Sequence, residues 1–138
     1  MPSAGEAGAL TCDCAVHRLV VEGRSAIIDY GRAKRLVPAD LWNALVARDH
    51  GCRFPGCCRP AAWTDAHHVV HWSHGGPTAI ANLVLLCRRH HRRLHREGYH
   101  AKLLPDASFE VTHPDGYTEA TVAPGPIAEV FRRRFGGS

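Results

Sequence analysis

The 138-residue sequence contains no run of about 18 apolar residues, so no segment is long enough to cross a membrane as a helix. Its first ten residues, MPSAGEAGAL, lack the basic and apolar stretches of a secretory signal. The sequence also contains no internal repeat. We therefore expect a soluble, cytoplasmic protein, and a hydrophobic content of 45% is ordinary for one small globular domain.

Six cysteines are present. In an intracellular chain they indicate metal binding rather than the disulfide framework of a secreted protein. The formal net charge is +4, from 17 Lys and Arg against 13 Asp and Glu, and this balance alone says little about partners. The distribution of charge is more informative, because five arginines fall within nine residues. These are Arg88, Arg89, Arg92, Arg93 and Arg96.

The first third of the chain divides into a lead-in and a structured segment. Residues 1–14 are mostly small and polar, and we expect them to be disordered. Residues 15–51 are predicted to form a hairpin that turns at Gly23, followed by a helix that packs on the core. Apolar residues at three- and four-residue spacing place this helix from Pro38 to Asp49.

The rest of the chain is predicted to complete an α+β fold. Residues 52–98 have the pattern of a strand, a loop, a second strand and a helix, at 66–72, 73–81, 83–86 and 87–97. Residues 99–138 have the pattern of three strands and a basic tail, with strands at 99–104, 109–112 and 117–122. A Pro-Asp-Gly turn at residues 114–116 separates the last two strands.

One set of residues has the composition and spacing of a structural zinc site. Its members are Cys52, Cys57, Cys87 and His90. Four residues separate the first pair and two separate the second, so each chain segment can offer two ligands to one tetrahedral ion. The alternative is a group of buried free cysteines near a histidine. Cys58 adjoins the first pair and could compete with Cys57, whereas Cys12 and Cys14 are assigned no function.

A second set contains imidazoles alone: His67, His68, His91 and His95. His91 and His95 lie about 40° apart on a helix, an arrangement that offers two ligands to one metal. His67 or His68 would provide the third ligand, because consecutive residues of a regular strand face opposite sides. This division indicates one ligand and one base, although surface solvation or a chance helical pair are alternatives. Three further histidines, His71, His74 and His100, are interpreted as loop or interface residues.

The residues DAHHVVHWSHGGPTAIANLVLLCRRHHRRLH, with CRFPGC upstream, resemble the HNH endonuclease family, whose core is a ββα-metal (His-Me) finger. They most closely resemble the C-terminal HNH domains of actinobacterial repeat-element and phage-related proteins. With its cysteine-rich site, this chain is expected to be a zinc-stabilised form of that core. The resemblance covers residues 52–98. It implies that His68 is the general base and that Asn82 is the central asparagine of the site. His67, His91 and His95 then match the ligands of the catalytic metal.

The resemblance also implies an activity. We expect metal-dependent hydrolysis of DNA phosphodiesters that leaves 5′-phosphate and 3′-hydroxyl ends. Many relatives have Asp where His67 stands, and three neutral nitrogens favour Zn²⁺, Ni²⁺ or Mn²⁺ over Mg²⁺. The five arginines are expected to contact phosphates, with a merely solvated helix face as the alternative. The N-terminal domain that often accompanies such modules is missing, so targeting would depend on a homodimer or on a larger parent or partner protein.

Two other functions stay open. One is a non-catalytic, zinc-stabilised module that binds nucleic acid or protein. The other is a nicking or structure-specific nuclease that acts with partners.

Overall fold

A computed structural model describes residues 18–21 and 24–125, and side chains from Ile27 onward. The predicted lead-in, the turn at Gly23, Cys12, Cys14 and most of the predicted basic tail therefore lie outside the described residues. Within the described part, helices and strands mix in the way expected of the α+β class. None of the described helices is long and apolar enough to span a bilayer.

The N-terminal part is a hairpin followed by a helix. Strand β1 (Arg18–Val21) pairs antiparallel with β2 (Arg24–Ile27), and helix α2 spans Ala39–Asp49. Asp40, in the first turn of α2, accepts hydrogen bonds from the Ile27 backbone N–H at 3.0 Å and the Tyr30 hydroxyl at 2.7 Å. This carboxylate therefore ties the hairpin to the start of the helix.

The central unit is a ββα arrangement. Strand β3 (Thr64–His68) pairs antiparallel with β4 (Leu83–Cys87), and helix α3 (Arg88–Leu94) follows directly. The strand predicted at 66–72 is therefore wrong in its bounds. It ends at His68 because the chain then turns into a loop whose backbone bonds to the side chain of Asn82 instead of to a strand. The helix predicted at 87–97 is also shorter than expected.

The loop between β3 and β4 is more structured than its composition indicates. It contains short 3-10 turns at Trp72–His74 and Ile80–Asn82. After α3, strands β5 (His100–Leu103), β6 (Phe109–Thr112) and β7 (Thr118–Thr121) form an antiparallel sheet in sequence order. The prediction for β6 is confirmed residue for residue, and its two neighbours are shorter than predicted.

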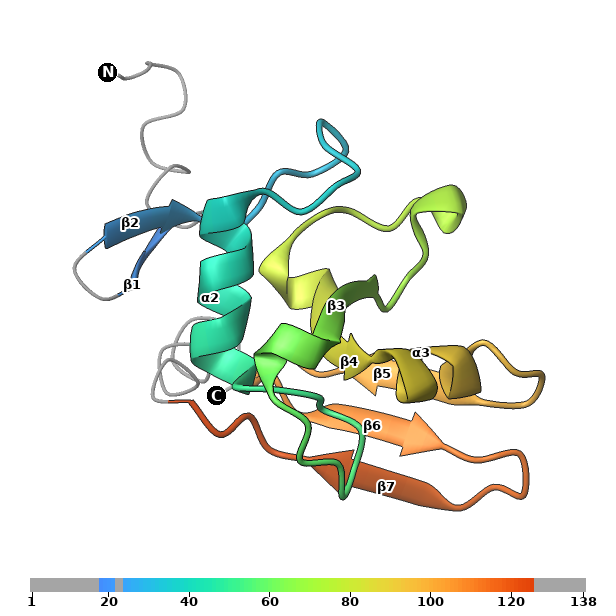
Figure 1. The fold of residues 1–138 in the computed structure, drawn as a ribbon. Helices are drawn as coiled ribbons and strands as arrows, with labels where there is room; N and C mark the ends of the chain where they lie inside the picture. Colours follow the sequence, from blue (N-terminus) through green and yellow to red (C-terminus); the bar gives the residue numbers. More distant parts are fainter. Residues whose placement is uncertain (1–17, 22–23, 126–138) are drawn as a thin grey trace.

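Strand β4 is buried along its whole length and is shared by two hydrophobic clusters. Leu83 and Leu85 pack with Leu41 and Leu45 of α2. Val84 and Leu86, on the opposite face, pack with a second cluster that contains Phe109 of β6. Figure 1 shows α2 and the β5–β7 sheet as separate layers on different sides of the molecule. Because both layers pack on β4, the ββα unit is held from both faces.

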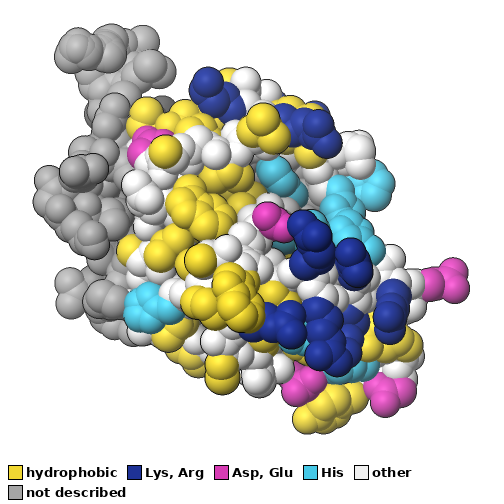
Figure 2. Space-filling view, in the orientation of Figure 1, with side chains coloured by type: hydrophobic (Ala, Val, Ile, Leu, Met, Phe, Trp, Pro, Cys, Tyr) yellow, Lys and Arg dark blue, Asp and Glu magenta, His cyan; other side chains and the backbone are white. Residues whose placement is uncertain are grey.

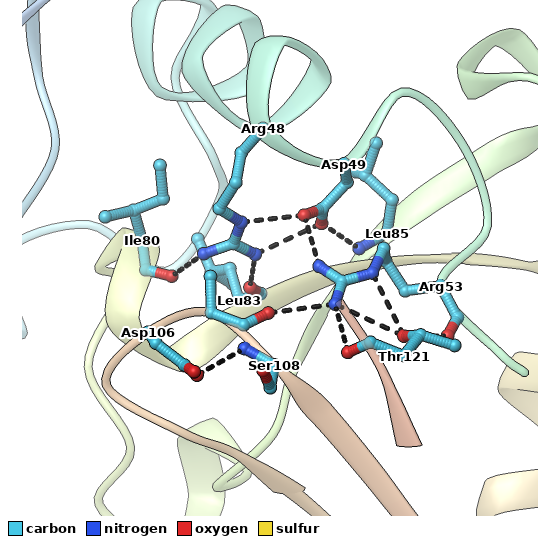
Figure 3. A network of polar contacts seen from close by, with 10 residues as sticks. Arg48, Asp49, Arg53, Ile80, Leu83, Leu85, Asp106, Ser108 and Thr121 are labelled. Atoms are coloured by element: carbon cyan, nitrogen blue, oxygen red, sulfur yellow. Dashed lines mark hydrogen bonds and ion pairs between the residues drawn. The ribbon is translucent and has the colours of Figure 1, made fainter. Parts of the chain in front are cut away.

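A buried ionic network also joins these layers (Figure 3). Arg48, Asp49 and Arg53 are each at most 3% exposed, and Asp49 accepts a 2.7 Å bond from each arginine. Arg48 also donates to the backbone oxygen of Leu83 at 2.6 Å, and Arg53 donates to that of Ala107 at 2.8 Å. The network was not predicted from the sequence, although it connects the end of α2 to β4 and to the C-terminal sheet.

Candidate active site and metal centres

The four residues of the predicted zinc site lie together. The ligand atoms of Cys52, Cys57, Cys87 and His90 are all within 4.8 Å of one another. The Nδ1 atom of His90 lies 3.3 Å from the Cys87 sulfur and 3.6 Å from the Cys52 sulfur. A tetrahedral zinc ion with Zn–S bonds of about 2.3 Å separates its ligand atoms by roughly 3.5–3.8 Å. The cluster therefore has the donors and the dimensions of a structural zinc site.

Local structure explains how this cluster forms. A tight turn in which the Cys57 N–H donates to the Phe54 oxygen at 3.0 Å brings the first two cysteines together. Gly56 has φ +84° within this turn, a conformation that side chains rarely adopt. Cys87 ends β4, and His90 lies in the first turn of α3. The Phe54 ring stacks on the His90 imidazole with 4.2 Å between centroids and orients it.

Burial and a neighbouring guanidinium set the electrostatics of the cluster. Burial raises the pKa of Cys52 to about 12, so this thiol loses its proton near neutral pH only in the presence of a metal. Three thiolates and one Zn²⁺ carry a net negative charge, and the Arg59 guanidinium lies 3.5 Å from the Cys87 sulfur, where it donates a hydrogen bond. Arg59 is thus placed to offset that charge.

The imidazole set forms a second cluster. The ring nitrogens of His67 on β3 and of His91 and His95 on and after α3 lie within 4.8 Å of one another. Burial lowers the pKa of His67 to about 3, with a further contribution from His91. Burial also lowers the pKa of His91. These two imidazoles are therefore neutral near pH 7, the state in which histidine binds metals.

His71 accompanies this cluster, which the sequence reasoning missed. Its ring stacks on His95 at 5.3 Å between centroids and lies 5.6 Å from the His67 ring. The loop after β3 folds back toward α3 and brings His71 there. Its position in the sequence, four residues after His67 and in a loop, carries no signal of this return.

His68 lies outside the imidazole cluster but lines the same cleft. Its Nε2 atom is 3.0 Å from the Thr78 hydroxyl oxygen, and Thr78 is completely buried. Burial lowers the pKa of His68, and the charges of Arg35, His71 and Arg32 lower it further. The two consecutive histidines of β3 are thus separated, one among the three clustered imidazoles and one bonded to Thr78.

Asn82 holds the loop between β3 and β4. Its Nδ2 atom donates to the backbone oxygens of Val70 at 3.0 Å and Pro77 at 2.9 Å, and its Oδ1 atom accepts from the Val70 N–H at 2.9 Å. The backbone of Gly76 lies close to both Val70 and Asn82, since a Cβ at residue 76 would overlap the Val70 oxygen and lie 2.9 Å from Asn82 Nδ2. Asn82 thus braces the backbone of the loop that carries His71 and Thr78.

The histidines line a cleft of about 1050 Å³. One side is formed by β3 and α3, and another by residues 35–37 together with Trp42. Figure 2 shows histidine side chains gathered between two groups of Lys and Arg side chains. Of the five arginines predicted to contact phosphates, four are exposed: Arg88, Arg89, Arg92 and Arg96. Arg93 is partly buried, with its guanidinium 5.5 Å from the Phe54 ring centroid.

The structural class is that of a small α+β domain whose ββα unit carries two candidate metal centres. A family model described as HNH endonuclease matches residues 52–97, the part that contains both ligand sets. This match indicates a nuclease-type or nucleic-acid-associated function. It also agrees with a divalent metal as cofactor.

Similar proteins occur in Mycobacterium tuberculosis. The chain is 40% identical over 84 residues to uncharacterized protein Rv3776, an alignment that covers 60% of this chain and 16% of that protein. It is 41% identical over 84 residues to uncharacterized protein Rv2100, covering 60% of this chain and 15% of that protein. The chain thus spans about a sixth of the length of these relatives. No solved structure shows significant similarity to it, and the predicted likeness to repeat-element and phage-related proteins stays a prediction.

Proposed function

We propose that this chain is a metal-dependent DNA endonuclease in which His68 is the general base. The observation that supports this most directly is the cleft itself. Three clustered imidazoles and a separately oriented histidine line one cavity, in a segment that matches the HNH endonuclease family. The four residues Cys52, Cys57, Cys87 and His90 hold a structural zinc ion that stabilises the fold.

The catalytic metal is held by His67, His91 and His95. Their ring nitrogens lie close enough together to bind one ion, and three protein ligands leave coordination positions for water and substrate. Nitrogen donors favour Zn²⁺, Ni²⁺ or Mn²⁺ over Mg²⁺, which prefers oxygen. When bound, such an ion supplies stabilisation of negative charge on the phosphate and on the leaving oxygen.

The hydrogen bonds of Thr78 orient His68 for proton transfer. The Thr78 hydroxyl donates its only hydrogen to the backbone oxygen of Arg35 at 3.3 Å, so its oxygen accepts a hydrogen bond from the N–H at His68 Nε2. His68 Nδ1 then keeps its lone pair and accepts a proton from the attacking water. The lowered pKa keeps this imidazole neutral near pH 7. Cleavage leaves 5′-phosphate and 3′-hydroxyl ends.

The DNA backbone is bound mainly by the arginines on and just after α3. Arg88, Arg89, Arg92 and Arg96 are exposed and contact phosphates, which gives salt-dependent binding with little sequence recognition. Arg93 belongs to the same group in sequence, and its guanidinium lies over the Phe54 ring, which stacks on His90 of the zinc cluster. Asn82 contributes by bracing the loop that carries Thr78.

A plasmid assay tests this function. Supercoiled DNA is incubated with the protein and Mn²⁺, Ni²⁺, Zn²⁺ or Mg²⁺ in turn, and nicked and linear products are separated on a gel. His68→Ala should abolish cleavage while the zinc content and circular dichroism spectrum stay those of the wild type. His100→Ala, at an exposed histidine of β5, is the matched control and should cut normally.

The outcomes separate the competing functions. Cleavage that survives in His68→Ala removes this residue from the role of base. Binding of DNA with no cleavage in any of the four metals supports instead a zinc-stabilised nucleic-acid-binding module. Products that stop at the nicked circle indicate a nicking enzyme.

A further inference from the structure

Residues 31–37 connect the N-terminal hairpin to α2 and form part of the candidate active site. Fourteen residues, 38–51, separate them from the matched region, residues 52–97. Even so, Arg35, Leu36 and Val37 line the same cleft as the metal-type histidines. In Figure 1 the connection projects on the same side of the molecule as the loop between β3 and β4.

Backbone hydrogen bonds fix this segment to the loop after β3. The Thr78 N–H donates to the Gly31 oxygen at 2.8 Å, and the Tyr30 N–H donates to the Thr78 oxygen at 2.9 Å. Asp29 and Ala79 form an isolated antiparallel bridge alongside. With the hydroxyl bond from Thr78 to the Arg35 oxygen, these contacts make the segment a defined wall of the cleft.

Arg32 strengthens the attachment. Its NH1 atom donates to the backbone oxygens of Trp72 at 2.7 Å and Gly76 at 3.1 Å. Its guanidinium carbon lies 3.7 Å from the centroid of the Trp72 ring, a cation–π contact. Because these contacts occupy the Arg32 side chain, it holds the wall in place instead of serving as a free phosphate ligand.

Lys34 and Arg35 are the remaining cations of the segment, and both side chains are exposed. Arg35 lines the cleft together with His68, and its backbone oxygen accepts a hydrogen bond from the same Thr78 hydroxyl that contacts His68 Nε2. The exposed arginines of α3 come from the helix that contributes His91 to the lining of the same cleft. The two groups of basic side chains with histidines between them in Figure 2 match this arrangement.

We infer that residues 31–37 are the second wall of a nucleic-acid-binding cleft, in which Lys34 and Arg35 bind backbone phosphates across from the arginines of α3. This inference rests on the proposed function, and it extends the DNA-binding surface beyond the segment that matches the family. A strand that enters the cleft then meets positive charge on both sides of the histidines. Contacts of this kind are made to phosphates and carry no direct sequence information.

Salt-dependent binding tests the second wall. The full chain carrying His68→Ala, which prevents cleavage, is titrated onto a short fluorescent duplex, and anisotropy gives the Kd at several KCl concentrations. Each lost phosphate contact lowers the slope of log K against log salt by about 0.9. Lys34→Gln/Arg35→Gln should therefore lower the slope by about 1.8 and weaken binding roughly ten- to sixty-fold near 0.1 M salt. Duplexes of unrelated sequence should respond equally.

Three comparisons control the result. Lys102→Gln removes an exposed lysine of β5 that does not line the cleft and should leave the slope unchanged. Arg88→Gln/Arg89→Gln should lower the slope as much as the Lys34 and Arg35 double variant does. Lys34→Arg/Arg35→Lys keeps both charges and should bind like the parent. If the Gln substitutions weakened binding through a folding defect in this segment, this exchange should weaken binding as well.

The possible results are distinct. An unchanged slope for Lys34→Gln/Arg35→Gln, with a lower slope for Arg88→Gln/Arg89→Gln, overturns the second wall and leaves the nuclease proposal standing. A loss no larger than that of Lys102→Gln also overturns it. A lower slope in a chain whose wild type cuts no plasmid supports the wall and refutes the nuclease. Absence of DNA binding by the wild type overturns both.

Discussion

Replacing Asp49 should destabilise the protein more than replacing any exposed carboxylate. Asp49 is 2% exposed, and its carboxylate accepts bonds from both Arg48 and Arg53. It also accepts the backbone N–H of Leu85 at 3.2 Å. This one side chain therefore pairs with two buried cations and satisfies a donor of the central strand β4 (Figure 3).

The expected loss follows from these contacts. Removing one partner of a buried ion pair costs about 3–5 kcal/mol, and leaving a buried N–H unpaired costs about 1–3 kcal/mol more. Arg48 and Arg53 keep their bonds to the backbone oxygens of Leu83 and Ala107, which limits the loss. We expect Asp49→Ala to lower the free energy of unfolding by about 4–5 kcal/mol, a large share of the 5–15 kcal/mol typical of a domain.

Urea denaturation at a fixed free zinc concentration measures this loss, because zinc bound to the folded state adds to its stability. With a slope of about 2 kcal/mol per molar urea, the midpoint should fall by roughly 2 M. Asp115→Ala is the control, since this exposed turn carboxylate accepts only a local bond from the Tyr117 N–H. Its effect should stay within about 0.5 kcal/mol. If Asp49→Ala lowers the free energy of unfolding by less than about 1 kcal/mol, the network contributes little to stability, and the estimate for a broken buried ion pair does not apply to it.

Three further predictions concern the site. Cys87→Ser should remove the tightly bound zinc and the cooperative unfolding transition. His91→Ala should keep one zinc per chain and lose cleavage. Metal content and urea unfolding, measured together on both variants, distinguish the two centres. Thr78→Val should lower kcat by up to about 100-fold with little change in KM, and Thr78→Ser should restore most of it; equal losses in both variants contradict the hydroxyl as the orienting group for His68. Asn82→Ala should cost about 1–3 kcal/mol, because the Val70 N–H that it satisfies loses its partner, and an unchanged thermal midpoint excludes the bracing role.

The two centres differ in what holds their ligands in place. The cysteine-rich set joins a tight turn after α2 to the junction of β4 and α3, so it constrains the backbone of the central unit. The imidazole set uses one buried side chain of β3 and two side chains at and beyond the end of α3. Loss of metal from the first is therefore expected to unfold the chain, while loss from the second is expected to stop catalysis alone.

Much of the candidate site was readable because its ligands come in short, regular spacings. Cys87 and His90, or His91 and His95, are related by one helical turn, so their proximity follows from helix geometry. Strand alternation likewise predicted that consecutive histidines of β3 would separate. The resemblance to the HNH family singled out His67 as the metal ligand, and His67 is the one that joins the imidazole cluster in the fold. The helix α2 and strand β6 were predictable for the same reason, since their apolar residues follow the period of their own element.

Contacts between distant segments were decided by tertiary packing alone. Three contacts depend on how separate elements fold over β4. They are the hydrogen bond between His68 and Thr78, the approach of His71 to His95, and the attachment of residues 31–37 to the loop after β3. The same is true of the buried ion pairs that Asp49 makes with Arg48 and Arg53. From their charge alone, these three residues would be expected at the surface. The short spacing within each ligand pair shows that its two residues can share a metal, because covalent geometry fixes their relative positions within one turn or one helix. The orientation of the proposed base and the proposed second wall of the cleft depend on long-range packing, which local periodicity does not encode.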